Sequence, residues 1–529
     1  MFRILVSDHL NPEGWDVLRA ADDVEVDGPC ADRESVLKAV GDVEALIVRS
    51  ATQVDVELLD RAPWLRVVAR AGARLDNVDI EEATQRGIMV INVPDANVIA
   101  VAEHTLAMML ALARSIPEGY VSLRAGRWER YHMLGIQLKG KALGIIGYGR
   151  HGREVAGRAQ AFGMRVLAYD PHIDETVARE RGVSIVPLDE LLSRSDVISL
   201  HAAVMPETTR VLDAGAFACM RDGVRIVNCT HADLIDEAAL LDALNSGKVA
   251  GAALDTFAQE PPPADHPLIH HPNVIAVPHL SQNTVESQRE TSRLVAEQVL
   301  DALRGDDYRN VVNLPYGPGA EYLTCRPYVE LAEKLGRLLG QLAGREVRRV
   351  EVEVQGDGMQ RLVRPIAAAL LSGLLRRFPA GARPINTVSA PIVAHEQGIE
   401  TRQVMGMELV DYPSLISCRA HWEGGSQVVA GVLSAGGEAR LVQCGSIRVD
   451  VKPEGHLLYL ENKDVPGVIG RVGTLLGANG INIGEWRLGR DRPGGRGVSF
   501  VSLDWPCPQD VLDQLLRLPD VYQAKLVKL

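Results

Sequence analysis

The chain has 529 residues, enough for roughly three to five domains of ordinary size. Apolar residues make up 46% and charged residues 24%, values that are ordinary for a folded globular protein and that argue against global disorder. The 56 Lys and Arg against 69 Asp and Glu give a net charge of −13, which excludes a non-specific nucleic-acid binder because such a protein needs a basic face.

The apolar stretches also exclude a membrane span. The longest, such as Thr105–Ala113 and Ile366–Leu375, reach only about ten residues, whereas a spanning helix needs about 20. The N-terminal residues carry polar and acidic side chains and do not form a signal peptide. The 7 cysteines are scattered and never form a CxxC pair, so we expect a reduced, cytoplasmic protein without a metal site.

The first 310 residues alternate short β-branched runs with helical patterns. The runs do not alternate apolar with polar residues, which is typical of strands buried on both faces. Helices between such strands imply parallel sheets, and ten strands suit two sheets better than one. The predicted strands are Ile4–Ser7, Ala45–Val48, Val67–Ala69, Ile88–Val93, Leu143–Ile146, Val166–Ala168, Val197–Leu200, Val224–Val227, Val249–Leu254 and Val274–Val277.

Two helical patterns connect the predicted sheets. Residues 97–114 would lead from the first α/β unit into the second, and Thr284–Arg304 would lead back. We therefore expect two open parallel-sheet, Rossmann-like domains, one discontinuous (1–96 and 285–314) and one continuous (97–284).

The texture changes after the Pro- and Gly-rich segment 315–319. Residues 325–375 are predicted to be helical around one strand, and residues 385–451 contain several β-like runs, which indicates an α+β domain over 316–452. The last stretch, 455–529, reads strand, helix, strand, strand, helix, strand. This βαββαβ order predicts a ferredoxin-like module.

A glycine motif follows the strand Leu143–Ile146 directly. In Gly147-Tyr148-Gly149-Arg150-His151-Gly152, the first glycine permits a tight turn, the second lets the backbone approach a pyrophosphate, and the third lets helix and strand pack closely. Gly147, Gly149, Arg150, His151 and Gly152 are therefore the predicted pyrophosphate-binding residues. A glycine turn that binds no ligand is the alternative.

A carboxylate stands where a dinucleotide ribose would need one. Asp170 ends the next predicted strand, 23 residues after Gly147, where it would accept from the ribose hydroxyls and repel a 2′-phosphate. The sequence therefore favours NAD over NADP.

A histidine and a glutamate are candidates for acid–base chemistry. His279 follows the strand Val274–Val277, at the end of the sheet where open α/β proteins bind ligands, and Glu260 precedes it by 19 residues. A carboxylate on one ring nitrogen would fix the tautomer and stabilise the protonated ring, which could then exchange a proton with a carbonyl oxygen while hydride moves to or from carbon. Spacing alone also allows His279 to be a surface-loop histidine, and it predicts no catalytic role for His104, His132, His201, His270 or His271.

Several further short motifs occur in the same chain. They are Arg49-Ser50-Ala51-Thr52, Arg70-Ala71-Gly72, Asp76-Asn77-Val78-Asp79, Ala102-Glu103-His104-Thr105, Gly126-Arg127-Trp128-Glu129-Arg130, Asn228-Cys229, Ala253-Leu254-Asp255 and Pro278-His279-Leu280. Together with the glycine loop they resemble the D-isomer-specific 2-hydroxyacid dehydrogenase family, in its long, phosphoglycerate-oxidising form. The resemblance covers essentially the whole chain.

The resemblance implies roles for individual residues. His279 and Glu260 match the acid–base pair, and Asp255 matches the residue that meets the nicotinamide amide. The positions that hold the phosphate and carboxylate of a small phosphorylated 2-hydroxy acid are matched by Arg49, Arg70, Gly72, Asn97 and Arg130.

The resemblance also extends to the two C-terminal domains. It implies an intervening domain over 316–452 and a terminal ACT domain over 455–529, in which Asn462, Asp464 and Asn482 would bind L-serine between two copies. A plain dimerisation unit is the alternative for this module, and a homodimer or homotetramer is expected.

Four positions depart from the family pattern. After Asn228-Cys229 the family has Ala-Arg-Gly-Gly, whereas this chain has Thr230-His231-Ala232-Asp233 and so lacks the arginine that would clamp the substrate carboxylate. An imidazole cannot copy the bidentate guanidinium fork, and losing one such group costs about 10²–10³ in turnover. Arg74, Ser281 and Ala203 are the other departures.

Three readings of the function follow. In the first, the chain oxidises 3-phospho-D-glycerate to 3-phosphooxypyruvate with NAD, the first step of L-serine biosynthesis, and His231 or Arg74 partly replaces the missing arginine. In the second, it is a dehydrogenase of a related D-2-hydroxy acid. In the third, it is a catalytically impaired paralogue that binds NAD and serine and acts as a regulator.

Overall fold

The computed structural model describes residues 1–316, 322–343, 346–356, 358–376, 385–406, 412, 414–434 and 436–529. Residues 317–319 of the predicted Pro- and Gly-rich boundary lie outside these ranges. The chain divides into two compact units, and each is described separately below. One unit comprises 11–15 and 93–294, and the other comprises 1–10, 16–92 and 295–529.

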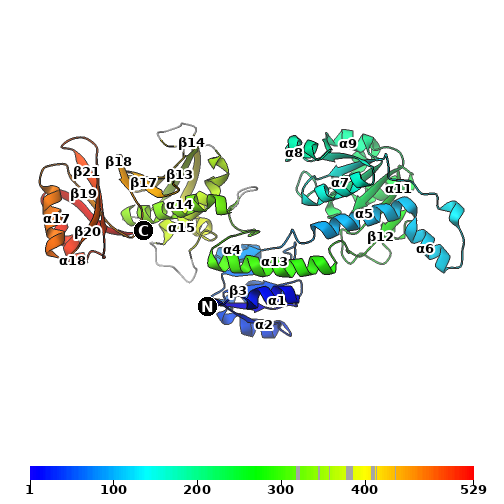
Figure 1. Ribbon diagram of the computed structural model, residues 1–529, viewed down its shortest axis with the longest axis horizontal. Helices are drawn as coiled ribbons and strands as arrows, with labels where there is room; N and C mark the ends of the chain where they lie inside the picture. The colour runs from blue at the N-terminus through cyan, green and yellow to red at the C-terminus, as the bar shows by residue number, and fades with distance from the viewer. Residues whose placement is uncertain are drawn as a thin grey trace. The chain divides into compact units, whose positions relative to one another are not determined.

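The unit formed by 11–15 and 93–294 is built on a seven-stranded parallel sheet (Figure 1). Its order, β12-β11-β10-β9-β6-β7-β8, is the doubly wound dinucleotide-binding order with one extra strand, and the order reverses between β6 and β9. The strands are β6 (Ala142–Ile146), β7 (Arg165–Tyr169), β8 (Ser184–Ile185), β9 (Val197–Leu200), β10 (Val224–Asn228), β11 (Val249–Leu254) and β12 (Val274–Ala276).

Helices cover both faces of this sheet. Leu143 and Ile145 of β6 point into a core shared with α5 and α7, whereas Ile146 points into a core shared with α9, α10 and α11. The helices are α5 (Val98–Arg114), α6 (Ile116–Arg124), η2 (Arg130–His132), α7 (Arg150–Ala161), α8 (Glu175–Glu180), α9 (Leu188–Arg194), α10 (Ala214–Cys219), η3 (Ala232–Leu234), α11 (Glu237–Asn245) and α12 (Pro267–His270). Because both faces are covered, the strands are mainly apolar, as their sequences predict.

The second unit begins with a five-stranded parallel sheet in the order β2-β1-β3-β4-β5, which is another doubly wound arrangement. Its strands are β1 (Phe2–Val6), β2 (Val24–Asp27), β3 (Ala45–Val48), β4 (Val67–Arg70) and β5 (Met89–Ile91). The helices of this region are α1 (Pro12–Arg19), α2 (Arg33–Ala39), η1 (Val40–Asp42), α3 (Val56–Asp60) and α4 (Ile80–Gln85), and α13 (Val285–Arg304) carries the chain back from the other unit.

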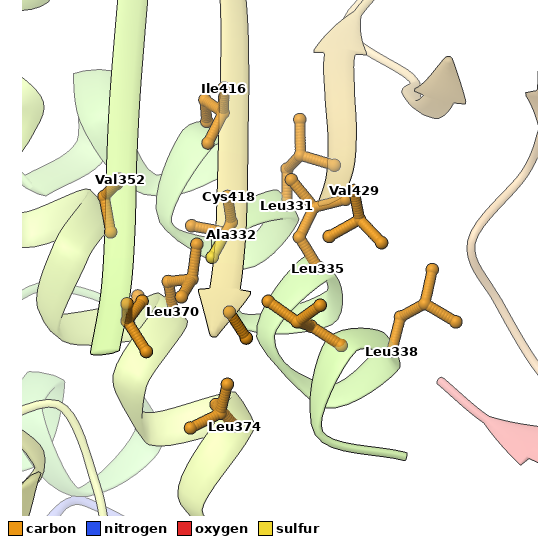
Figure 2. Packing of buried hydrophobic residues seen from close by; sticks show 14 of the residues in the cluster. Leu331, Ala332, Leu335, Leu338, Val352, Leu370, Leu374, Ile416, Cys418 and Val429 are labelled. Carbon is orange, nitrogen blue, oxygen red and sulfur yellow. The ribbon is translucent and has the colours of Figure 1, made fainter. Parts of the chain in front are cut away.

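A six-stranded mixed sheet, ordered β14-β13-β15-β16-β17-β18, follows in the same unit. The apolar helices α14 and α15 pack against it, and Figure 2 shows Leu335 and Leu370 of the two helices facing Val352 and Cys418 of the strands. The elements are α14 (Tyr322–Ala343), β13 (Arg349–Gly356), η4 (Met359–Leu362), α15 (Val363–Leu375), α16 (Ala390–Glu396), β14 (Glu400–Gly406), β15 (Ser414–Trp422), β16 (Gly425–Leu433), β17 (Ala439–Cys444) and β18 (Ile447–Val451).

The chain ends in an antiparallel four-stranded sheet, ordered β20-β21-β19-β22, with α17 and α18 packed on one face (Figure 1). Its elements are β19 (His456–Lys463), α17 (Val468–Ala478), β20 (Ile483–Arg490), β21 (Arg496–Leu503), α18 (Gln509–Leu516) and β22 (Val521–Lys528). The predicted βαββαβ order is confirmed. Tyr459 and Phe500 on the other face of this sheet belong to the same apolar cluster as α14 and α15.

The predicted fold class is confirmed, but the strands β2, β8 and β14 were not among the predicted strands. In β2, half-buried and exposed residues alternate at the edge of a sheet, and β8 has only two residues, so neither is a continuous apolar run.

Candidate active site

The glycine loop follows β6 at the point where the strand order reverses. Gly147 has φ 92°, a left-handed conformation that favours glycine, and a Cβ there would lie 2.4 Å from Ala202 N. A Cβ on Gly152 would lie 2.2 Å from the Gly147 carbonyl oxygen. Gly147 therefore lets the loop pass close to the segment after β9, and Gly152 lets α7 begin close to the loop.

Gly149 differs from its neighbours because it faces open space. It caps α7 with an ordinary φ of −73°, and a Cβ there would meet no atom within 4 Å. A backbone that is bare at the N-terminus of a helix can approach an anion closely. The three positions therefore fit a pyrophosphate, with Gly149 as the residue that would lie against it.

Asp170 lies beside the glycine loop, at the end of β7. Its carboxylate accepts from the backbone N–H groups of Tyr148 (2.9 Å) and His172 (2.9 Å). Arg150 at the first turn of α7 forms an ion pair with Asp95. The structure thus brings the predicted ribose-binding carboxylate to the pyrophosphate loop, as NAD requires.

His279 and Glu260 meet at the carboxyl end of the sheet. His279 Nδ1 lies 2.9 Å from Glu260 Oε2 and 3.1 Å from Oε1, and the side chains of His279 and Glu260 are about 27% and 31% exposed. Because a carboxylate only accepts hydrogen bonds, Nδ1 carries the proton and Nε2 is the atom left to exchange one. The Phe257 N–H also donates to Glu260 Oε1 (3.2 Å) and steadies the carboxylate.

An apolar cavity of about 360 Å³ adjoins this pair. Asp255, Glu260 and His279 contribute the ionisable groups of its lining. The remaining lining residues are Phe257, Pro261, Pro262, Ile269, Ala276, Val277 and Pro278.

The backbone of His279 is held in a left-handed conformation, with φ 49°. Asp255, at the end of β11, fixes this turn: its backbone oxygen accepts from the His279 N–H (3.0 Å), and its carboxylate accepts from the N–H groups of Leu280 (2.6 Å) and Ser281 (3.0 Å). The Asp255 side chain is fully buried in this arrangement. Its expected contact with the nicotinamide amide stays a prediction.

His104 reaches the same carboxylate from α5, with Nε2 3.4 Å from Asp255 Oδ1. Burial alone would raise the pKa of Asp255, but the His104 ring, the Ser281 side chain and the two backbone donors outweigh burial and lower it. Sequence reasoning missed His104. The available signal was an ionisable residue in an apolar helix that packs under the site.

Three imidazoles lie around the glycine loop. His151 Nε2 is 3.3 Å from Asn97 Oδ1, and burial, Arg150 and His231 lower the pKa of His151. His201 is buried against Ser199 (Nε2 to Oγ 2.8 Å), and burial followed by His151 lowers its pKa to about 3. The structure thus brings His151 into contact with Asn97 and into electrostatic reach of His231, one of the departures from the family pattern.

A cluster of cations lies at the carboxyl ends of β3 and β4 in the other unit. Arg70 NH2 is 3.5 Å from Asp76 Oδ1, and the Arg70 guanidinium also donates to the Arg74 backbone oxygen. Burial lowers the pKa of Arg70 most, Asp76 opposes the shift, and Arg74 and Arg49 add to it. Gly72 leaves room beside this guanidinium, since a Cβ there would lie 3.6 Å from Arg70 NH1.

The remaining predicted substrate residue, Arg130, lies in η2 and is exposed, with its guanidinium 4.7 Å from the centre of the Tyr131 ring. Cys229, at the carboxyl end of β10, is buried, and burial followed by the Asp255 charge raises the pKa of its thiol to about 12.

The three predicted effector residues do not meet within one chain. Asp464 follows β19 and binds Arg490 (3.0 Å) and the Gly494 N–H (3.1 Å), and these two donors lower its pKa. Asn482 precedes β20 and binds Asp504 (2.7 Å). In the register of β19 and β21, Lys463 pairs with Arg496 at one end and His456 pairs with Leu503 at the other. Ile483 of β20 also pairs with Leu503. Asp464, next to Lys463, and Asn482, next to Ile483, therefore lie at opposite ends of the sheet, about 20 Å apart. Asn462, whose amide donates to the Lys463 oxygen (2.8 Å), lies at the Asp464 end.

The doubly wound sheet, its bare glycine loop and the His–Glu pair define a class, that of the NAD-dependent dehydrogenases. Comparison with known families agrees. The NAD-binding domain of the D-isomer specific 2-hydroxyacid dehydrogenases matches residues 106–281, and the D-3-phosphoglycerate dehydrogenase intervening domain matches residues 324–445.

Relatives that align over the full chain specify the family within this class. The D-3-phosphoglycerate dehydrogenases of Archaeoglobus fulgidus and Bacillus subtilis are 39% and 38% identical to this chain, and each alignment covers 100% of both proteins. The chain therefore belongs to the D-3-phosphoglycerate dehydrogenase family.

Solved structures resemble more than half of the chain. The TT0316 protein from Thermus thermophilus is 35% identical with a TM-score of 0.52, and it aligns over 59% of this chain and 99% of its own. A glyoxylate reductase from Paecilomyes thermophila is 33% identical with a TM-score of 0.50, over 57% and 95%.

In the described part of the chain, no single helix has the length and apolar character needed to cross a membrane. The helices α5 and α6 reach that level only when taken together, and they are bent by 63° relative to each other.

Proposed function

We propose that this chain oxidises 3-phospho-D-glycerate to 3-phosphooxypyruvate with NAD, the first step of L-serine biosynthesis. The observation that carries the proposal is the His279–Glu260 pair at the carboxyl end of a dinucleotide-binding sheet. Full-length likeness to proteins named D-3-phosphoglycerate dehydrogenase supports the substrate.

The residues present account for the proton in this reaction. His279 Nε2 takes the proton of the C2 hydroxyl, the C2–H bond breaks, and its electron pair departs as hydride while the oxygen's electrons form the carbonyl of the keto acid. NAD, which Gly149 and Asp170 would help to hold, would supply the acceptor for that hydride. Glu260 stabilises the positive ring that results, and it holds Nδ1 so that Nε2 keeps its orientation.

We assign the substrate anions to arginines. In one unit these are Arg49 and Arg70, at the ends of β3 and β4, with Gly72, and in the other unit the assigned residues are Asn97 and Arg130. The electrostatic cluster of Arg49, Arg70 and Arg74 supports this assignment, because a doubly charged phosphate is bound best by several cations. Arg74, a departure from the family pattern, adds a third cation to that cluster.

One observation favours a second candidate, a dehydrogenase of a related D-2-hydroxy acid. His231 stands where the family has its clamping arginine, and it lies in electrostatic reach of His151. A pocket with two imidazoles in this place would suit a substrate whose carboxylate is held less firmly. If the replacement of the arginine by His231 abolishes turnover, the chain is instead an impaired paralogue that binds NAD and serine.

Turnover and binding measured on one preparation separate these candidates. Purified full-length protein is mixed with NAD and 3-phospho-D-glycerate from about pH 6 to 9, NADH formation is recorded, and NADH binding is measured by calorimetry. We expect NADH formation. Binding of NADH without turnover on 3-phospho-D-glycerate contradicts the main proposal, and a panel of 2-hydroxy and 2-keto acids then identifies the alternative substrate or establishes the impaired paralogue.

We further propose the four domains that the sequence predicts: a substrate-binding domain (1–96 and 285–314), an NAD-binding domain (97–284), an intervening domain (316–452) and an ACT domain (455–529). L-Serine would bind between two ACT domains, one contributing Asn462 and Asp464 and the other Asn482. The opposite ends that these residues occupy in one sheet support a site that needs two chains. Serine titration by calorimetry tests this, and absence of heat would leave the ACT domain a dimerisation unit.

We also propose a cytoplasmic homodimer or homotetramer. Large apolar side chains are exposed over α6 and the segment after it, where Trp128 is 74% and Leu134 is 95% exposed. Such a patch is unusual on a monomer and suits a second copy. Sedimentation of the Trp128→Ser variant tests the proposal. If the dimer uses this patch, the variant should dissociate into monomers at a higher protein concentration than wild type does.

A further inference from the structure

His104 approaches the catalytic turn from a helix on the other side of the buried Asp255. Its Nε2 lies 3.4 Å from Asp255 Oδ1 and is not aligned as a regular hydrogen bond, so the interaction is an electrostatic contact. Since the carboxylate only accepts, the contact is attractive when Nε2 carries a proton. The His104 side chain is 21% exposed, whereas that of Asp255 is fully buried.

The Asp255 carboxylate acts on the reacting imidazole through the backbone. Its two oxygens accept from the N–H groups of Leu280 and Ser281, and its backbone oxygen accepts from the N–H of His279. A left-handed conformation at a histidine is unfavourable by about 1–2 kcal/mol, so the turn persists because these bonds hold it. The direction of the His279 ring therefore depends on an oriented, ionised carboxylate.

We propose that His104 is a positioning residue of the active site: it keeps Asp255 ionised and oriented, and Asp255 in turn fixes the turn 279–281 that carries His279. This inference rests on the proposed function, because it takes His279 as the acid–base group of that reaction. It gives Asp255 a positioning role that needs no direct contact with the coenzyme.

The surroundings of Asp255 explain why a partner on α5 matters. A buried carboxylate without sufficient donors takes up a proton, and a protonated Asp255 would point its own O–H at the Leu280 or Ser281 N–H. The Cys229 thiol, whose pKa the Asp255 charge helps to raise, carries no positive charge and cannot stabilise the anion, and the ring nitrogen Nδ1 of His279 is engaged by Glu260. The contact of His104, which lies in α5, adds a favourable electrostatic interaction to the two backbone donors around this carboxylate.

A double-mutant cycle on turnover tests the proposed route. His104→Phe keeps a ring of similar size and removes the nitrogen, and Asp255→Asn removes the charge and turns an amide N–H₂ toward a backbone N–H. We expect His104→Phe to lower kcat about 10- to 100-fold while the Kd for NADH stays within about twofold. Because His104 acts through Asp255, the double variant should be no slower than Asp255→Asn.

Two further variants frame this cycle. His104→Gln restores an N–H donor and should recover most of the lost turnover. His395 is an exposed histidine in α16. The variant His395→Phe is therefore the matched control and should leave kcat unchanged. The inference would be overturned if the kcat of the double variant falls by the product of the two single-variant losses. It would also be overturned if the Kd for NADH rises as much as kcat falls.

A second readout does not depend on the substrate. Diethyl pyrocarbonate labels accessible imidazoles, and mass spectrometry gives the labelling rate at His279 and, for comparison, at His395. We expect labelling at His279 to become at least about threefold faster in His104→Phe and in Asp255→Asn, since a loosened turn frees the ring. Unchanged labelling contradicts the inference, whereas a wild type that makes no NADH from 3-phospho-D-glycerate contradicts only the proposed function.

Discussion

A single methyl group at Gly149 should separate coenzyme binding from folding. A Cβ built on Gly149 meets no atom within 4 Å, and its φ of −73° is open to any residue, so Gly149→Ala introduces no clash and no strain. In the bound state, however, the methyl group would stand between the loop backbone and the pyrophosphate. The variant should therefore fold normally and bind NADH poorly.

The size of both effects can be worked from the structure. Replacing a glycine whose conformation alanine can adopt stabilises a protein by about 0.4–1 kcal/mol through the unfolded chain. A hydrogen bond to a charged group contributes about 1.5–3 kcal/mol, so the loss of one backbone–phosphate bond should raise the Kd for NADH about 10- to 100-fold. Gly152→Ala differs in sign for stability, because its Cβ would lie 2.2 Å from a backbone oxygen, and overpacking of this kind costs about 1–3 kcal/mol.

The helix that follows the loop supplies a matched control. Gly157 lies in α7, is exposed, and a Cβ there would meet nothing within 4 Å. Gly157→Ala should raise the free energy of unfolding by about 1 kcal/mol and leave the Kd for NADH unchanged. Calorimetric titration with NADH and urea unfolding measure the two quantities for all three variants.

The outcome that refutes this reasoning is specific. If Gly149→Ala binds NADH as tightly as wild type, the diphosphate does not lie against the bare backbone, and the glycine loop is a turn without a ligand. If Gly149→Ala is instead destabilised like Gly152→Ala, the space around it is not open.

Four further predictions follow from the site. His231→Arg should raise kcat about tenfold or more if the position merely lacks its carboxylate clamp, and lower turnover in steady-state assays would mean a pocket rebuilt for another acid. Glu260→Gln should lower kcat about 10²-fold with little change in the Kd for NADH, because the charge that stabilises the positive ring is gone. Asp170→Ala should raise the Kd for NADH about tenfold and reduce the ratio of the Kd for NADPH to the Kd for NADH, as competitive titrations would show. His201 is buried and neutral, with its pKa lowered to about 3, so at a pH below its ordinary pKa of 6.5 it gains a proton when the protein unfolds. Stability should therefore fall as the pH falls through 6.5, and the free energy of unfolding in urea should be about 1.4 kcal/mol lower at pH 5.5 than at pH 7.5. His201→Gln should lack this component.

The buried strands were the most predictable part of the fold. The predicted Val197–Leu200 and Val249–Leu254 coincide with β9 and β11 because such strands are apolar on both faces and end where the chain leaves the core. The edge strand β2 and the two-residue β8 lack this signature. Their pairing is set by the neighbouring strand rather than by their own sequence.

The contacts within the site divide in the same way. The pairing of Glu260 with His279 could be predicted because both follow neighbouring strands of a parallel sheet, whose carboxyl ends meet at one edge. The contact of His104 with Asp255 joins α5 to the segment after β11, and that of Asn97 with His151 joins the N-terminus of α5 to α7. They depend on how α5 and α7 pack against the sheet, which periodicity does not specify.

The departures from the family pattern acquire a physical meaning when charges are compared. The ring in electrostatic reach of His231 is His151, and burial together with Arg150 and His231 lowers the pKa of His151, so that ring is uncharged at neutral pH. An uncharged imidazole donates one hydrogen bond but supplies none of the fixed charge of a guanidinium. On the assignment proposed above, the charge that balances the substrate anions would therefore come from arginines such as Arg70 and Arg74. If so, what the loop at 231 has lost is charge near the reacting carbonyl rather than binding of the phosphate, and restoring it with His231→Arg should act on kcat more than on KM.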